Sequence, residues 1–134
     1  MEISATIRNS AAGHAASVRT GDNAQVLAIP AKASAPGSAV NGGEFLLLAL
    51  ATCYCNDLYR EAARLGIAVD GVEVEATAVF PGIGLAATDI RYRVRVDSSA
   101  DAAAVAELIR ETDAVAEVHN TLRAGVPVAL LDGA

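Results

Sequence analysis

The sequence of 134 residues contains no tryptophan, one methionine, two phenylalanines and three tyrosines, so large aromatic anchors for a core are scarce. Thirty residues are alanine, whereas valine, leucine, isoleucine and phenylalanine together number only 35. Although 53% of the residues are apolar, the core that they can build is therefore thin. We expect residues 1–134 to form a single domain, which suits their length, and a partner subunit to complete its core.

Several classes of protein are excluded by what is missing. The longest apolar run, from Phe45 to Ala51, is far shorter than the roughly 20 residues that span a bilayer, and the N-terminus lacks the pattern of a secretory signal. Ten basic residues, only one of them lysine, stand against sixteen acidic ones, which argues against nucleic-acid binding. Two cysteines cannot form a disulfide framework. We therefore expect an acidic, cytoplasmic protein that binds neither nucleic acid nor membrane.

The distribution of apolar residues predicts an α+β fold. Alternation of apolar and polar side chains indicates short strands, which we expect at 3–7, 14–20, 26–29, 72–80 and 90–96. A long helix should separate the third strand from the fourth, and two helices should follow the fifth. The residues after Pro127 can add a final strand. The predicted order of elements is βββ–α–ββ–αα–β.

The long central helix has the clearest signals. Asn41 and Glu44 have the spacing of a capping box at its start, and Gly66 suits its end. From Phe45 to Cys55 the helix carries almost no polar residue on any face, which predicts a front half that is buried all round. The residues expected to return its rear half to solvent are Asn56, Asp57, Arg60, Glu61 and Arg64.

The hairpin of the fourth and fifth strands should present a row of charges to solvent. If the chain turns near residue 83, Glu75 lies opposite Arg91 and Glu73 lies opposite Arg93. Such cross-strand pairs contribute about 0.2–1 kcal/mol each. We therefore interpret this face as a solvated, ion-paired surface.

The two helices after the hairpin have weaker boundary signals. Ser98 or Ser99 can cap the first of them. Asp113 has the position and residue type to begin the second. We therefore expect the two helices to meet at Asp113.

The one stretch that suggests chemistry lies inside the central helix, where Cys53 and Cys55 are two residues apart. Helix positions with this spacing point about 200° apart, so the two thiols can neither form a disulfide nor bind one metal ion, and we expect no metal and no cofactor. Two interpretations stay open: both thiols pack as small apolar side chains, or one of them is reactive. A reactive thiol needs a partner that favours the thiolate, and the candidates are His14, His119, Arg8, Arg19, Arg60, Arg64 and Glu44. Of these we select His119, Arg8 and Glu44, and we expect Arg60 and Arg64 on the wet face of the helix.

Two segments resemble the OsmC/Ohr family. The segment NGGEFLLLALATC, from Asn41 to Cys53, is similar to the one that opens that family's buried helix and carries the reactive cysteine twelve residues after an asparagine. The segment AEVHNTLR, from Ala116 to Arg123, resembles the family's Cys-Pro-x-Ser-Asn-x-x-Arg segment and matches its asparagine and arginine. The predicted order of elements also agrees, so the resemblance covers essentially the whole chain.

The resemblance implies a fold and an activity. The fold is an α+β subunit with an antiparallel sheet around a long buried central helix, and two subunits form an intertwined homodimer. The activity is thiol-dependent reduction of organic hydroperoxides, in which the reactive cysteine becomes a sulfenic acid. A second cysteine then closes a disulfide that a dithiol reductant opens. An arginine and a glutamate hold the thiolate and the peroxide.

The match of individual residues is incomplete. Cys53 stands at the position of the reactive cysteine. The position of the catalytic glutamate holds Gly43, and Glu44 lies one place later, about 100° further around a helix. Arg8 is the nearest match to the catalytic arginine of the first turn region. The resolving cysteine is replaced by Ala116, so the family's disulfide cannot form.

Two functions from different classes follow. In the first, the chain is a divergent peroxidase in which His119 or Arg8 assists Cys53 and an external thiol resolves the sulfenic acid. In the second, it is a non-catalytic homologue that binds a small hydrophobic ligand at the dimer interface. The missing glutamate and second cysteine motivate the second hypothesis, because a fold carries no function without its site.

Overall fold

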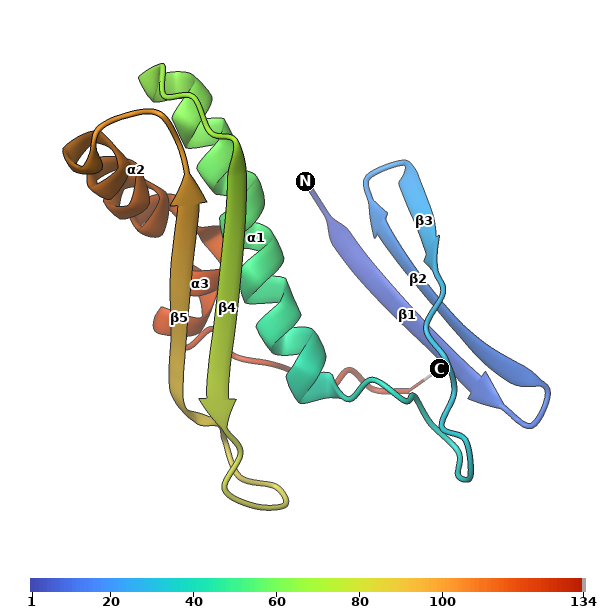
Figure 1. The fold of residues 1–134 in the computed structure, drawn as a ribbon. Coiled ribbons are helices and arrows are strands. Elements are labelled where there is room, and N and C mark those ends of the chain that lie inside the picture. Colours follow the sequence, from blue (N-terminus) through green and yellow to red (C-terminus); the bar gives the residue numbers. More distant parts are fainter. Residues whose placement is uncertain (134) are drawn as a thin grey trace. The chain divides into compact units, whose positions relative to one another are not determined.

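The structure, a computed structural model, describes residues 1–133 and combines antiparallel strands with three helices (Figure 1). The predicted α+β class is thereby confirmed. The elements are β1 (Ile3–Ser10), β2 (Gly13–Thr20), β3 (Asn23–Leu27), α1 (Gly42–Leu65), β4 (Gly71–Val79), β5 (Thr88–Asp97), α2 (Ala102–Val115) and α3 (Glu117–Arg123). Contacts within the chain divide it into two compact units, Met1–Phe45 and the residues from Leu46 onward.

The N-terminal unit is an antiparallel sheet in the order β1–β2–β3. Its second turn is tight, because Thr20 lies opposite Asn23 and Gly21 adopts a positive φ of 54°, which glycine tolerates without strain. β3 therefore begins directly after this turn and ends at Leu27. The third strand thus starts and ends earlier than the expected range 26–29.

The boundaries of α1 follow from local chemistry, as the sequence predicts. The Glu44 backbone N–H donates to Asn41 Oδ1 at 2.9 Å, and the Asn41 backbone N–H donates to Glu44 Oε2 at 2.9 Å. This is a complete capping box, which satisfies two backbone donors at the start of the helix. At the other end Gly66 has a φ of 69°, the left-handed conformation that terminates many helices.

The burial of α1 differs from the expectation in both halves of the helix. Within this chain the front half keeps an exposed surface, and Leu48 is 58% exposed. The buried residues form one stripe with helical spacing: Leu50, Tyr54, Asp57, Leu58, Glu61 and Ala62. Asp57 and Glu61 were expected on the wet face, but both are buried, because the other elements of the second unit pack along this stripe. Arg60, Asn56 and Arg64 are exposed, as predicted.

The hairpin of β4 and β5 has a different register from the expected one. Glu75 lies opposite Arg93 and Glu73 lies opposite Arg95, with a register shift between Thr77 and Val79. The centre of the hairpin is one residue later than predicted. Each residue of β4 therefore lies opposite a residue of β5 that is two positions further along the chain than expected. A shift of two keeps each side chain on its face, so the charged row still faces solvent.

The helices α2 and α3 meet at Ala116, not at Asp113. Asp101 caps α2, because its Oδ1 accepts the Ala104 backbone N–H at 2.7 Å, so the expected caps Ser98 and Ser99 lie before the helix. Asp113 stays inside α2, and the break comes at Ala116, whose φ of −68° and ψ of 105° are extended.

The last described residues do not form the strand expected after Pro127. Val128 and Leu130 are each 99% exposed, and no strand follows α3 in residues 1–133. A strand needs a partner for its backbone N–H and C=O groups, and none of the described strands pairs with this segment. The observed order is therefore βββ–α–ββ–αα.

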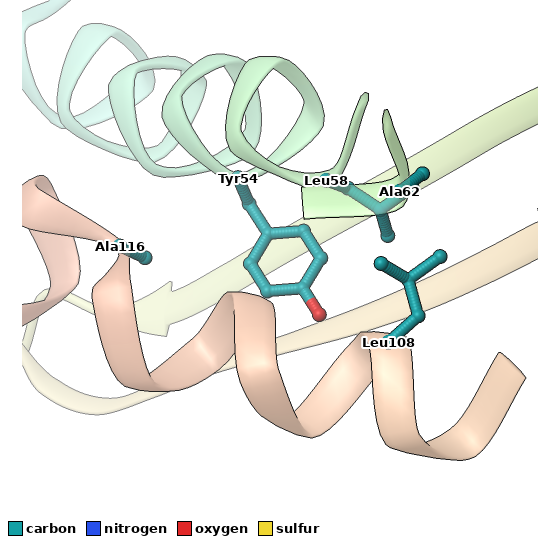
Figure 2. Packing of buried hydrophobic residues seen from close by; sticks show 5 residues of the cluster. All are labelled: Tyr54, Leu58, Ala62, Leu108 and Ala116. Carbon is teal, nitrogen blue, oxygen red and sulfur yellow. The ribbon is translucent and has the colours of Figure 1, made fainter. Parts of the chain in front are cut away.

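The core of the second unit lies between α1, α2 and the hairpin (Figures 1 and 2). Tyr54 and Leu58 project from α1 toward α2, where Leu108 projects back (Figure 2). All three side chains are fully buried, and the Tyr54 hydroxyl donates to the Ile109 carbonyl at 2.8 Å. Residues from both strands cover this cluster: Val72, Val74, Tyr92, Val94 and Val96. Among the described helices, none combines the length and the apolar character that crossing a bilayer requires.

Candidate functional site

Cys53 lies on α1 beside two carboxyl groups. Asp57 follows one helical turn later, and its Oδ2 is 3.5 Å from Cys53 Sγ, within hydrogen-bonding range for sulfur. Glu117 is the first residue of α3, and its Oε2 is 3.8 Å from the same sulfur. The break at Ala116 starts α3 at this point and so brings Glu117 to the thiol. Cys53 is partly exposed, so small molecules can reach it.

Arg60 holds the two carboxylates from their other side. Its guanidinium is 2.9 Å from Asp57 Oδ1 and 3.7 Å from Glu117 Oε1. Each carboxylate therefore faces the thiol with one oxygen and the guanidinium of Arg60 with the other. The donor atoms of Cys53, Asp57 and Glu117 also lie within 4.8 Å of one another, and the single positive charge of Arg60 is shared between the two carboxylates.

These surroundings favour the protonated thiol. Burial raises the pKa of Cys53, and the negative charges of Asp57 and Glu117 raise it further. The backbone N–H of Val118 acts against this rise, because it points a hydrogen-bond donor at the sulfur. At neutral pH the resting site therefore holds a thiol rather than a thiolate.

The two carboxyl groups differ in their affinity for a proton. Burial and a hydrogen bond with Glu117 raise the pKa of Asp57, although Arg60 opposes the rise. The pKa of Glu117 is lowered, first by its own backbone N–H at the start of α3 and then by the hydrogen bond with Asp57. Of the two groups, Asp57 therefore binds a proton more readily than Glu117 does.

His119, a predicted partner of the thiol, faces the core instead. Its ring packs against Tyr92, with centroids 4.7 Å apart, and against Tyr54, with centroids 5.8 Å apart. Neither of its ring nitrogens has a hydrogen-bond partner in the structure, and its pKa is lowered by burial and by the charge of Arg123. The structure therefore does not bring His119 together with Cys53 through a hydrogen bond.

Glu44 and Arg8, the other two predicted partners, lie in the N-terminal unit. Glu44 is engaged in the capping box, and Cys53 follows nine positions later on the same helix, about 13.5 Å along its axis. Arg8 is an exposed residue of β1 opposite Ala15, and no ion pair of it is found among residues 1–133. The capping box thus accounts for the position of Glu44, and Arg8 belongs to the other compact unit from Cys53.

Two residues of the site, Asp57 and Glu117, were not among the candidates from the sequence, and Arg60 was a candidate assigned to the solvent face. A signal for Asp57 was present, because residues four apart on a helix share a face. Arg60 then follows Asp57 at a spacing that permits an ion pair. For Glu117 the signal was weaker: it stands directly after Ala116, the position of the family's resolving cysteine, which must approach Cys53 in that family.

Comparisons with known structures agree with this fold. An OsmC-like protein from Mycoplasma pneumoniae has a TM-score of 0.64 at 19% sequence identity, over 91% of this chain and 86% of that one. A protein from Legionella pneumophila described as an organic hydroperoxide resistance protein OsmC has a TM-score of 0.59 at 14% identity, over 92% and 90% of the two chains. An OsmC-like protein from Vibrio cholerae has a TM-score of 0.58 at 13% identity, over 90% of this chain and 93% of that one.

The sequence matches a family model but none of the curated proteins. A family model described as OsmC-like protein matches residues 35–130, which include α1, the hairpin, α2 and α3. This range contains Cys53 and its neighbours Asp57 and Glu117, and it is well over half of the sequence. The chain therefore belongs to the OsmC-like protein family.

Proposed function

We propose that this chain is a Cys53-dependent reductase of organic hydroperoxides in which Asp57 and Glu117 handle the protons. The observation that carries the proposal is the contact of the Cys53 sulfur with both carboxyl groups, at 3.5 and 3.8 Å. Membership of the OsmC-like family supports the class of reaction, and one structural neighbour is described as a hydroperoxide resistance protein.

The proposed reaction begins with the transfer of the thiol proton to the Glu117 carboxylate. The sulfur then attacks the terminal oxygen of the hydroperoxide, a sulfur–oxygen bond forms, and the oxygen–oxygen bond breaks. The alkoxide that leaves takes a proton from the carboxyl pair and departs as an alcohol, while Cys53 becomes a sulfenic acid. Sulfur loses two electrons and the peroxide gains them, so the step needs no further oxidant.

An external thiol completes the proposed cycle. It condenses with the sulfenic acid to give a mixed disulfide and water, and a second thiol then releases Cys53. We also propose that the chain works in the cytoplasm as a single-domain protein and as a homodimer. The 58% exposure of Leu48 on α1 supports a dimer, because an apolar helix face of this kind is normally covered.

Consumption of tert-butyl hydroperoxide in the presence of dithiothreitol tests this function. We expect the wild type and Cys55→Ser to consume the peroxide and Cys53→Ser to be inactive. Mass spectrometry after trapping with dimedone should find the sulfenic acid on Cys53. Equal, slow oxidation of both cysteines with no turnover would overturn the proposal.

A second candidate is a non-catalytic homologue that binds a small hydrophobic ligand. The character of the Cys53 surroundings favours it: the described side chains that hydrogen-bond the sulfur are both carboxyl groups, and these disfavour the reactive thiolate. This function predicts that no hydroperoxide is consumed. It also predicts that Cys53→Ala keeps its affinity for an apolar probe such as 1-anilinonaphthalene-8-sulfonate. This binding, together with the absence of turnover by the wild type, separates it from the first proposal.

A further inference from the structure

A small cavity lies within the second unit, between α1, β5 and α3. Its volume is about 220 Å³, and the residues that line it are Leu50, Ile90, Tyr92, His119, Leu122 and Arg123. Cys53 and its two carboxyl neighbours are not among them. The cavity is therefore a separate feature of the molecule from the thiol site.

His119 is the unusual residue of this cavity. It is only 4% exposed, yet neither Nδ1 nor Nε2 has a hydrogen-bond partner. A buried polar group without a partner is costly, and native proteins almost always satisfy such groups with protein atoms, water or a ligand. The protein supplies no partner here, so the cavity that His119 lines is the place from which one can come.

The aromatic neighbours of His119 decide what kind of partner is missing. Its ring meets Tyr92 edge to face, with an interplanar angle of 66°, and Tyr54 at 60°. An imidazole N–H can point at the negative face of a tyrosine ring as a weak hydrogen bond. The other nitrogen of a neutral imidazole carries a lone pair, which an aromatic face does not satisfy. A hydrogen-bond donor is therefore the partner that this second nitrogen lacks.

The remaining polar groups of the cavity wall are already engaged with Asp113. Tyr92 donates its hydroxyl hydrogen to Asp113 Oδ1, and Arg123 makes an ion pair with the same oxygen at 2.7 Å. The positive charge at the wall is thus balanced within the protein, and an anionic ligand would have to compete with Asp113. The other lining residues are aliphatic. The cavity suits an uncharged molecule with an apolar body.

We propose that this cavity binds a small neutral molecule with an apolar body and one hydroxyl group, an alcohol or a phenol, whose O–H donates to His119. A volume of about 220 Å³ is sufficient for one ring, because an engineered cavity of roughly 150 Å³ holds benzene. Since both nitrogens are covered, binding requires the imidazole to turn about its Cβ–Cγ bond toward the ligand.

Titration of the full chain with phenol, observed by NMR at the histidine Cε1–H signals, tests this proposal. We expect the His119 signal to shift and to saturate, while the signal of His14, the other histidine, stays in place. Toluene, which has no hydroxyl, should bind about fivefold more weakly. Benzoate, which has the same ring and a negative charge, should not compete with phenol.

Two variants separate the cavity from other binding surfaces. Leu122→Trp places a larger side chain in the cavity and should abolish phenol binding, whereas Leu131→Trp, at a residue that is 82% exposed and outside the cavity, should not. Cys53→Ser should bind phenol as the wild type does, so the result is independent of the proposed reductase activity. A His119 signal that does not respond to phenol, or binding that survives in Leu122→Trp, would overturn the inference.

Discussion

Asp57 Oδ2 lies 3.5 Å from the sulfur of Cys53, one helical turn away on α1, and Glu117 Oε2 reaches the same sulfur from α3. This arrangement has two opposite effects on the thiol. The negative charges disfavour the thiolate, but the carboxyl groups can accept and return a proton during a reaction. Experiments that measure the ionisation of the thiol and the reaction rate separately can show whether Asp57 and Glu117 have a structural or a catalytic role beside Cys53.

The variant Glu117→Gln should change two rates in opposite directions. Removing the charge lowers the pKa of Cys53, so iodoacetamide should alkylate the thiol faster at pH 7. The increase is roughly fivefold, the effect of about 1 kcal/mol of repulsion across 4 Å in a water-like medium. Removing the proton acceptor should slow hydroperoxide reduction about a hundredfold, the lower end of the usual range for acid–base catalysis.

The matched control for this experiment is Glu107→Gln. Glu107 lies on α2 and pairs with Arg110, and the substitution makes the same change in net charge. We expect it to leave both rates unchanged. If Glu117→Gln shifted both rates in the same direction, the carboxyl group would have only an electrostatic or structural role.

The alkylation of Cys53 should depend on pH in a way that reflects its burial. Because its pKa is raised, the thiolate fraction keeps increasing at pH values where an ordinary thiol is already ionised. In the Cys55→Ser background, the midpoint of the rise in the iodoacetamide rate should therefore lie above about pH 8.5, the midpoint of an ordinary thiol. A plateau below that pH would show that the surroundings of Cys53 stabilise the thiolate and do not disfavour it.

Asp113 should stabilise the fold mainly at pH values above the ordinary pKa of a carboxyl group. Arg123 is the main cause of its lowered pKa, and Tyr92 adds a hydrogen bond. A lowered pKa means that folding favours the carboxylate, so the stabilisation is present near pH 6 and is lost as the pH falls through the lowered value. Asp113→Asn should cost about 1 kcal/mol near pH 6, with allowance for its partial exposure.

Urea unfolding of Asp113→Asn and the wild type between pH 6 and pH 3 measures this effect. The difference in the free energy of unfolding should shrink as the pH falls. Asp89→Asn is the control, because Asp89 pairs with Arg91 on an exposed surface. Its effect should be well below 1 kcal/mol at every pH.

The capping box should be important for stability but not for the thiol. Asn41→Ala removes the oxygen that accepts the Glu44 N–H and should cost about 1 kcal/mol, whereas Asn41→Ser should cost little. Glu44→Gln keeps an acceptor for the Asn41 N–H, so we expect neither stability nor the alkylation rate of Cys53 to change. A changed alkylation rate in Glu44→Gln would show that Glu44 acts on the thiol after all.

Features that depend on neighbouring residues in the sequence were predictable. The start and end of α1 depend on Asn41, Glu44 and Gly66, whose side chains or backbone act within one turn. The alternation of β4 and β5 correctly separated the faces of the hairpin, because the period of a strand is a local property. The register was not predicted correctly, because it depends on the conformation of the turn and on the shift between Thr77 and Val79.

The site was predicted only in part, because burial depends on tertiary packing. Asp57 has a polar side chain and was assigned to the solvent face, but the helix stripe on which it lies is covered by other elements. His119 and Glu117 are two residues apart on α3, so they point about 200° apart, and Glu117 is the one that meets Cys53. The position of the break before α3 decides which of the two residues faces Cys53. The prediction from the sequence placed that break three residues too early, at Asp113.

The alanine at position 116 has a kinetic consequence for the proposed cycle. Ala116 is fully buried at the break before α3 and carries no sulfur, so a sulfenic acid on Cys53 has no partner thiol at this position. Recycling of the protein would then be a second-order process. Its rate would increase in proportion to the concentration of the surrounding thiol, and the lifetime of the oxidised protein would report the redox state of its compartment.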